Sequence, residues 1–156
     1  VYDAATPAAV GVAAHEAGHA VQYAENYLPI RIRAAIIPAT NLGSKLSVPL
    51  ILLGLILPSF RLFEPYTDFF NTLAWIGVAC YGLCLLFQLV TLPTEYNASR
   101  RAVAAIEQCG LLTRDEQQGA KKVLKAAALT YVAALSVTLM QLLRLVMIVG
   151  GRRRRD

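Results

Sequence analysis

Three strongly apolar stretches dominate the pattern of hydrophobic and polar positions along this chain. Residues 72–92 and 126–149 are each long enough, at about 1.5 Å of helix per residue, to cross the ~30 Å hydrocarbon core of a membrane. Residues 46–60 are also apolar but short, so this stretch is a short span, a span extended by its flanks, or a segment that re-enters the same face. No alternating strand pattern competes. The pattern predicts an all-α polytopic membrane protein with about three transmembrane segments.

A further helix is predicted before these stretches, over residues 7–27. Thr6 can cap its first turn, and Pro7 suits the first helical position. Pro29 is expected to stop it. Residues 31–45 then carry turn signals, including a proline and an Asn-Leu-Gly-Ser run, and we expect a connector there.

Polar segments after residue 92 predict two more helix boundaries. Pro93 is expected to separate the apolar helix from a polar helix over residues 94–109, which ends at Gly110. Thr113 and Glu116 then form a capping box, and the helix that they begin continues into the last apolar stretch.

Composition supports a membrane location for what we expect to be one domain, residues 1–156. Hydrophobic residues make up 56% of the 156, more apolar surface than one soluble domain of this size can bury. The chain begins at Val1, and we expect it to be an N-terminally truncated fragment. Its net charge is +5, and the basic run at residues 152–155 beside an apolar span favours the lipid bilayer over nucleic acid as a partner. Oligomeric state is not indicated.

The pentapeptide HEAGH, at residues 15–19, carries the candidate chemistry. On a helix, His15 and His19 point from the same face one turn apart, so both imidazoles can bind one zinc ion. Glu16 is placed to take a proton from a zinc-bound water. The motif predicts a zinc-dependent hydrolase with Glu16 as general base. The alternative is a pair of helix-surface histidines without metal.

A third zinc ligand has to come from elsewhere in the chain. The extended metzincin motif needs a histidine where Glu25 stands, and no Asp, Glu, His or Cys occurs from residue 26 to 63. Glu64 and Asp68 follow one apolar crossing and would lie on the opposite face. Glu95 follows two crossings and returns to the face of HEAGH, so we predict Glu95 as the ligand. Alternatively, Glu95 only complements the dipole of a helix N-terminus.

Three blocks, VAAHEAGHAVQ, LFQLVTLPTEYNASRRA and GAKKVLKAAALTYVAAL, resemble the YugP-type membrane zinc metallopeptidases over nearly the whole chain. The middle block is also similar to the E-x-x-A-D pattern of membrane gluzincins such as HtpX and the CAAX prenyl protease. The resemblance implies zinc as cofactor, with His15, His19 and Glu95 as ligands. Ser99 replaces the aspartate of that pattern and, with Asn97, is a candidate to orient the ligands.

The function that follows is a zinc metallopeptidase that cleaves membrane proteins or peptides presented at the membrane. Two alternatives stay open: an intramembrane site-2-type protease, and a non-enzymatic scaffold whose structural zinc takes a fourth ligand from Asp3, Glu107 or Cys109. The resemblance to HtpX-like enzymes favours an active site on the cytoplasmic face.

Overall fold

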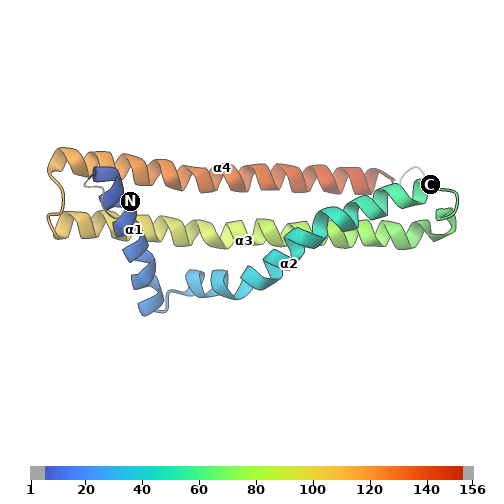
Figure 1. Cartoon of the computed structure of the whole chain (residues 1–156), viewed down its shortest axis with the longest axis horizontal. Coiled ribbons are helices and arrows are strands. Elements are labelled where there is room, and N and C mark those ends of the chain that lie inside the picture. The colour runs from blue at the N-terminus through green and yellow to red at the C-terminus, as the bar shows by residue number, and fades with distance from the viewer. Residues whose placement is uncertain (1–5, 153–156) are drawn as a thin grey trace. The chain divides into compact units, whose positions relative to one another are not determined.

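Long helices make up almost all of residues 6–152, which are the residues that the computed structural model describes (Figure 1). The order of elements is α1 (Pro7–Ala24), α2 (Leu28–Ile56), the short 3-10 helices η1 (Leu57–Ser59) and η2 (Glu64–Tyr66), α3 (Thr67–Gln108) and α4 (Arg114–Arg152). No strand occurs within residues 6–152. Of the basic run at residues 152–155, the described part includes only the backbone of Arg152.

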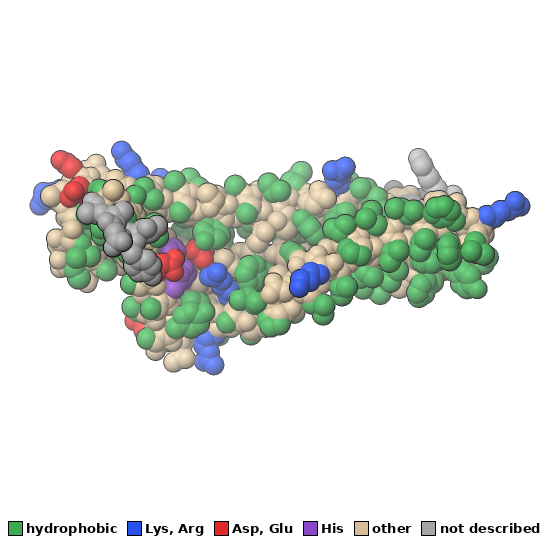
Figure 2. Space-filling model, viewed as in Figure 1, with side chains coloured by type: hydrophobic (Ala, Val, Ile, Leu, Met, Phe, Trp, Pro, Cys, Tyr) green, Lys and Arg blue, Asp and Glu red, His purple; other side chains and the backbone are tan. Residues whose placement is uncertain are grey.

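Three helical segments are long and apolar enough to cross a membrane, namely Leu28–Ser59, Glu64–Gln108 and Arg114–Gly151. Many of their large hydrophobic side chains face outward: Val137, Met140 and Met147 on α4 are 69%, 66% and 67% exposed. Figure 2 shows hydrophobic side chains gathered densely over the second half of α2. Water disfavours so much exposed apolar surface, whereas lipid does not. The prediction of an all-α membrane protein is confirmed.

The chain divides into two compact units. Unit 1 contains Val1–Ala34 and Leu89–Ala134, and so holds α1, the start of α2, the end of α3 and the start of α4. Unit 2 contains Ala35–Gln88 and Leu135–Asp156. The core of unit 2 is small and apolar, built from Ile51, Ala74, Val78 and Val149. The candidate chemistry lies in unit 1.

The first boundary differs from the sequence prediction. α1 ends at Ala24, and Asn26 then adopts a left-handed φ of 55°. α2 begins at Leu28, so Pro29 is its second residue. A proline in the first turn of a helix removes an N–H that has no helical partner there. Pro29 therefore helps to begin α2, and the prediction that it stops the first helix was wrong.

The predicted connector at residues 31–45 is also wrong, because α2 runs through it. Pro38 and Pro49 lie inside this 29-residue helix. Each proline removes one backbone hydrogen bond, but in apolar surroundings a continuous helix satisfies nearly all other backbone groups. Gly43, which indicated a turn, instead permits a close helix contact: a Cβ there would lie 2.8 Å from the Cys80 carbonyl oxygen of α3. The short stretch 46–60 thus extends a helix long enough to span.

Pro93 does not end a helix either. α3 continues through it from Thr67 to Gln108. The exposed ring of Pro93 leaves the Leu89 carbonyl without its helical donor, while the Thr94 hydroxyl donates to the Val90 carbonyl at 3.2 Å. Glu95 therefore lies deep inside a helix, and the alternative that it complements a helix N-terminus does not hold.

Three predicted helix caps agree with the structure. Thr6 accepts a hydrogen bond from the Ala9 amide at 3.2 Å and caps α1. Gly110 takes a φ of +60° just after α3, which a residue without Cβ adopts at little cost. At the start of α4, Glu116 accepts a hydrogen bond from the Thr113 amide at 2.9 Å, as a capping box requires.

The stability of unit 2 is predicted to depend on the missing side chain of Gly54. A Cβ at Gly54 would collide with the Phe70 carbonyl oxygen and lie 2.6 Å from Ala74 Cβ, whereas a Cβ at Gly82 has nothing within 4 Å. Both glycines are helical, so Ala gains up to about 1 kcal/mol of helix propensity at each. We expect Gly82→Ala to be neutral or stabilising, and Gly54→Ala to lower the free energy of unfolding by about 1–3 kcal/mol. Helical circular dichroism during denaturant unfolding in detergent measures both, and equal effects would contradict the contact.

Candidate metal centre

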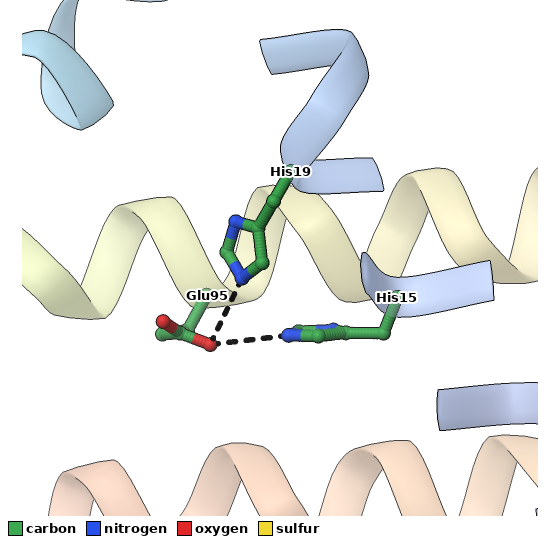
Figure 3. Close-up of side chains that lie close together, drawn as sticks. All are labelled: His15, His19 and Glu95. Carbon is green, nitrogen blue, oxygen red and sulfur yellow. Dashed lines mark hydrogen bonds and ion pairs between the residues drawn. The ribbon is translucent and has the colours of Figure 1, made fainter. Parts of the chain in front are cut away.

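The HEAGH motif lies on α1 and brings both histidines toward Glu95 of α3 (Figure 3). The imidazole rings of His15 and His19 meet edge to face, with centroids 4.7 Å apart. Glu95 Oε2 lies 3.2 Å from His15 Nε2 and 3.6 Å from His19 Nε2. The three residues form a group whose ligand atoms all lie within 4.8 Å of one another. Residues from two distant parts of the sequence thus converge on one point.

A backbone contact allows α1 and α3 to come this close. Gly18, inside the motif, is buried, and a Cβ added to it would lie 2.8 Å from the Ala98 carbonyl oxygen. Ala98 itself is fully buried. Any larger side chain at position 18 would push the two helices apart. Gly18 therefore fixes the distance between the imidazoles and the carboxylate.

Gln22 determines which nitrogen of His19 faces Glu95. The Gln22 amide nitrogen donates to the Thr94 carbonyl at 2.8 Å and to Asn97 Oδ1 at 2.9 Å. Because a backbone carbonyl only accepts, the amide nitrogen must point to α3 and Gln22 Oε1 must face His19. The His19 Nδ1 to Gln22 Oε1 distance is 2.9 Å, so Nδ1 carries the proton. The lone pair of Nε2 is left directed at the cluster.

Two more side chains hold Gln22 in this orientation. Asn97 Oδ1 also accepts from Arg101 Nε at 2.8 Å, which fixes the Asn97 amide as well because Arg only donates. Arg101 in turn pairs with Glu25, just past the end of α1. Its hydrogen bond holds the pKa of the exposed Glu25 carboxyl below its usual value. A continuous polar chain thus runs from the His19 ring to the protein surface.

The outer nitrogen of His15 has its own partner, since Ser99 Oγ lies 3.1 Å from His15 Nδ1. Both residues that the sequence suggested as orienting groups, Ser99 and Asn97, are therefore next to the cluster. Ser99 contacts His15 directly, whereas Asn97 acts through Gln22. In both histidines Nδ1 is occupied and Nε2 faces Glu95.

Glu95 is only 2% exposed, and its second oxygen is also bound. Arg33 of α2 donates to Oε1 at 2.9 Å, which leaves Oε2 for the histidine side. The Tyr131 side chain of α4 also interacts electrostatically with Glu95. A carboxylate buried to this degree needs such partners to remain charged.

Gln22, Arg33 and Tyr131 were not found by sequence reasoning. Gln22 left a signal, because it stands three residues after His19 and so lies on the same helical face. Arg33 fell in the predicted connector, and Tyr131 lies in an apolar stretch far from the motif. Nothing local in the sequence links these two residues to Glu95.

Zinc chemistry fits this group of donors. Two imidazoles and one carboxylate are a common ligand set for catalytic zinc. Ligand atoms at 2.0–2.1 Å from a tetrahedral zinc lie about 3.3 Å apart. The two distances from Glu95 Oε2 to the histidines, 3.2 Å and 3.6 Å, bracket that separation, and all three ligand atoms lie within 4.8 Å of one another. Of the fourth ligands considered, Glu107 pairs with Lys121, Cys109 is exposed, and Asp3 lies outside the described residues. Glu16 is exposed beside His15.

Two comparisons with known proteins bear on the class of this chain. A family model described as "Putative neutral zinc metallopeptidase" matches residues 1–150, and the chain belongs to this family. It is 41% identical over 153 residues to the "Putative membrane protease YugP" of Bacillus subtilis (strain 168), an alignment that covers 97% of this chain. The chain spans 63% of that relative's length. No solved structure matches the chain. The predicted family resemblance is confirmed.

Zinc affinity is predicted to depend on Gln22. In Gln22→Leu the His19 Nδ1 proton loses its acceptor, so we expect the zinc dissociation constant to rise about 10- to 100-fold. Competition with a chromophoric chelator measures it. Gln22→Glu changes the shape of the side chain less. It keeps an acceptor for the His19 Nδ1 proton but loses both hydrogen bonds that the Gln22 amide donates. The matched control is exposed Gln118→Leu. Wild-type affinity in a fully helical Gln22→Leu protein would show that Gln22 does not orient His19.

Proposed function

We propose that this protein is a zinc-dependent membrane peptidase that hydrolyses peptide bonds of membrane proteins or of peptides presented at the membrane. The observation that carries the proposal is the convergence of His15 Nε2, His19 Nε2 and Glu95 Oε2, with both outer histidine nitrogens already bound. Family membership supports the same chemistry. Three protein ligands leave a fourth position open, as catalytic zinc sites require.

Different side chains bind the metal and transfer the proton during hydrolysis. His15, His19 and Glu95 would hold the zinc ion, which would supply Lewis-acid chemistry to the substrate carbonyl and the attacking water. The Glu16 carboxylate, which follows His15 on α1 and is exposed, accepts the proton of the attacking water. It then passes this proton to the leaving amine. Arg33 and Ser99 keep Glu95 and His15 in place throughout.

The position of the site suggests substrates at the membrane surface. With 42 residues, α3 is about 63 Å long, roughly twice the hydrocarbon thickness. Its polar end carries Glu95, Asn97 and Arg101, and therefore belongs near a membrane face. We place this face on the cytoplasmic side, which the resemblance to HtpX-like enzymes favours.

Two variants separate metal binding from proton transfer. We expect Glu16→Gln to retain about one zinc per chain but to lose peptide hydrolysis by at least 100-fold, because only the base is removed. Glu95→Ala should lose both zinc and hydrolysis, because a ligand is removed. Elemental mass spectrometry and turnover of a casein-derived peptide in detergent measure the two properties. Equal turnover by wild type and Glu16→Gln would overturn the peptidase proposal, and full zinc in Glu95→Ala would overturn the ligand assignment.

Reporter fusions test the orientation. With three crossings, a fusion after Leu111, between α3 and α4, lies on the face of the site, whereas a fusion after Arg61, between α2 and α3, lies on the other. We expect alkaline phosphatase, which is active only outside the cytoplasm, to be active after Arg61 and inactive after Leu111. The reverse pattern would place the site outside the cytoplasm.

A further inference from the structure

A second feature of unit 1 is a pocket of about 250 Å³ between α3 and α4. Its lining combines apolar and cationic side chains, including Ser99, Arg100, Lys121, Leu124, Lys125 and Ala128. The zinc ligands do not line it. The pocket therefore needs an explanation of its own.

The pocket is next to the metal centre, because the two share Ser99. Ser99 lines the pocket and also contacts His15 Nδ1. On α4, Leu124, Ala128 and Tyr131 are spaced four and three residues apart, so they share one helical face, and the Tyr131 side chain interacts electrostatically with Glu95. The pocket and Glu95 are thus neighbours along the line where α3 and α4 meet, which we call the seam.

Helix geometry gives the separation between them. Ala128 and Leu124 stand three and seven residues before Tyr131, which is about 4.5–10 Å along the axis of α4. An extended peptide advances about 3.3 Å per residue. A peptide lying along the seam with its scissile bond at the metal centre would therefore place a side chain two or three residues away into the pocket.

The chemistry of the lining defines that side chain. Leu124 and Ala128 are buried and form an apolar floor. Lys121 shares its charge with Glu107, but Arg100 and Lys125 have no acidic partner within residues 6–152. Arg100 and Lys125 are exposed, so their stems line the pocket while their charges stay at its rim, an arrangement complementary to a carboxylate on a short apolar stem. Glutamate has this form.

We propose that this pocket binds an acidic side chain of the substrate, two or three residues from the scissile bond. The inference rests on the proposed peptidase function and adds a substrate class to it: segments that carry Glu or Asp close to the cleavage site. The phosphate of an anionic lipid would also match the cations. The peptide is favoured because Ser99 lines the pocket and also contacts His15 of the metal centre.

Binding to the Glu16→Gln protein tests the pocket without turnover. The probes are fluorescent alanine-rich decapeptides with one Glu or one Gln at each scanned position, and anisotropy in detergent gives their dissociation constants. We expect the best Glu peptide to bind roughly three- to tenfold more tightly than its Gln counterpart. This ratio should fall toward one at high salt, because exposed charges are screened.

A matched pair of double variants tests the residues. Arg100→Gln with Lys125→Gln should abolish the Glu preference, whereas Arg114→Gln with Lys122→Gln, which removes the same charge outside the pocket, should keep it. Arg100→Glu with Lys125→Glu should transfer the preference to a Lys peptide. Each ratio compares two peptides on one protein, so a general loss of folding does not imitate the result.

The outcomes separate the two proposals. If wild type hydrolyses the peptides but no variant changes the Glu preference, the pocket proposal is overturned and the peptidase stands. If Glu peptides bind through Arg100 and Lys125 but wild type cleaves none of them, the pocket is supported and the peptidase is overturned. If phosphatidylglycerol raises the melting temperature of wild type and the control but not of Arg100→Gln with Lys125→Gln, and Glu preference is absent, the occupant is a lipid and the pocket proposal fails.

Discussion

The contact between Gly18 of α1 and the Ala98 backbone of α3 is the constraint on which the site depends. It lies between the two histidines in the sequence of α1 and between Glu95 and Arg101 in the sequence of α3. With no side chain at position 18, the helices approach until His15 and His19 reach Glu95. Small residues at helix contacts are common in membrane proteins, where close packing replaces the hydrophobic effect as the force that holds helices together. Here the same packing also sets the geometry of the chemistry.

Burial of charge beside this contact is balanced by a complete set of partners. Glu95 is bound through Oε1 by Arg33 and approached by both histidines at Oε2. Gln22 is fully buried, yet its amide oxygen and nitrogen are all used. Networks in which every member is satisfied become rigid, whereas a single missing partner leaves a costly unpaired group. The cations of unit 1 thus have two roles: Arg33 and Arg101 hold the site, while Arg100 and Lys125 remain available to a ligand.

Sequence patterns were reliable where the physics is local. The caps at Thr6, Gly110 and Thr113 depend on a few neighbouring residues, and all three agree with the structure. The prolines were misleading, because their effect depends on surroundings: Pro29 starts a helix, and Pro38, Pro49 and Pro93 lie inside helices. Proline rules derived from water-soluble proteins predict too many helix ends in a membrane protein, because lipid offers the backbone no hydrogen-bonding partners outside the helix. The counting of crossings still placed Glu95 correctly beside HEAGH, since it used the number of spans and not their exact ends.

By itself, the sequence determined the all-α membrane class and the three residues that converge, because apolar length, helical spacing and the order of crossings are properties of the chain alone. The family followed from the resemblance of three sequence blocks. Only the tertiary structure decided what surrounds the three residues. Arg33, Tyr131 and the pocket beside Ser99 arise where α2, α3 and α4 meet in unit 1. Some of these contacts join residues far apart in the sequence: Arg33 and Glu95 are 62 positions apart. No local periodicity encodes them, because which faces of separate helices meet is settled by packing between the helices.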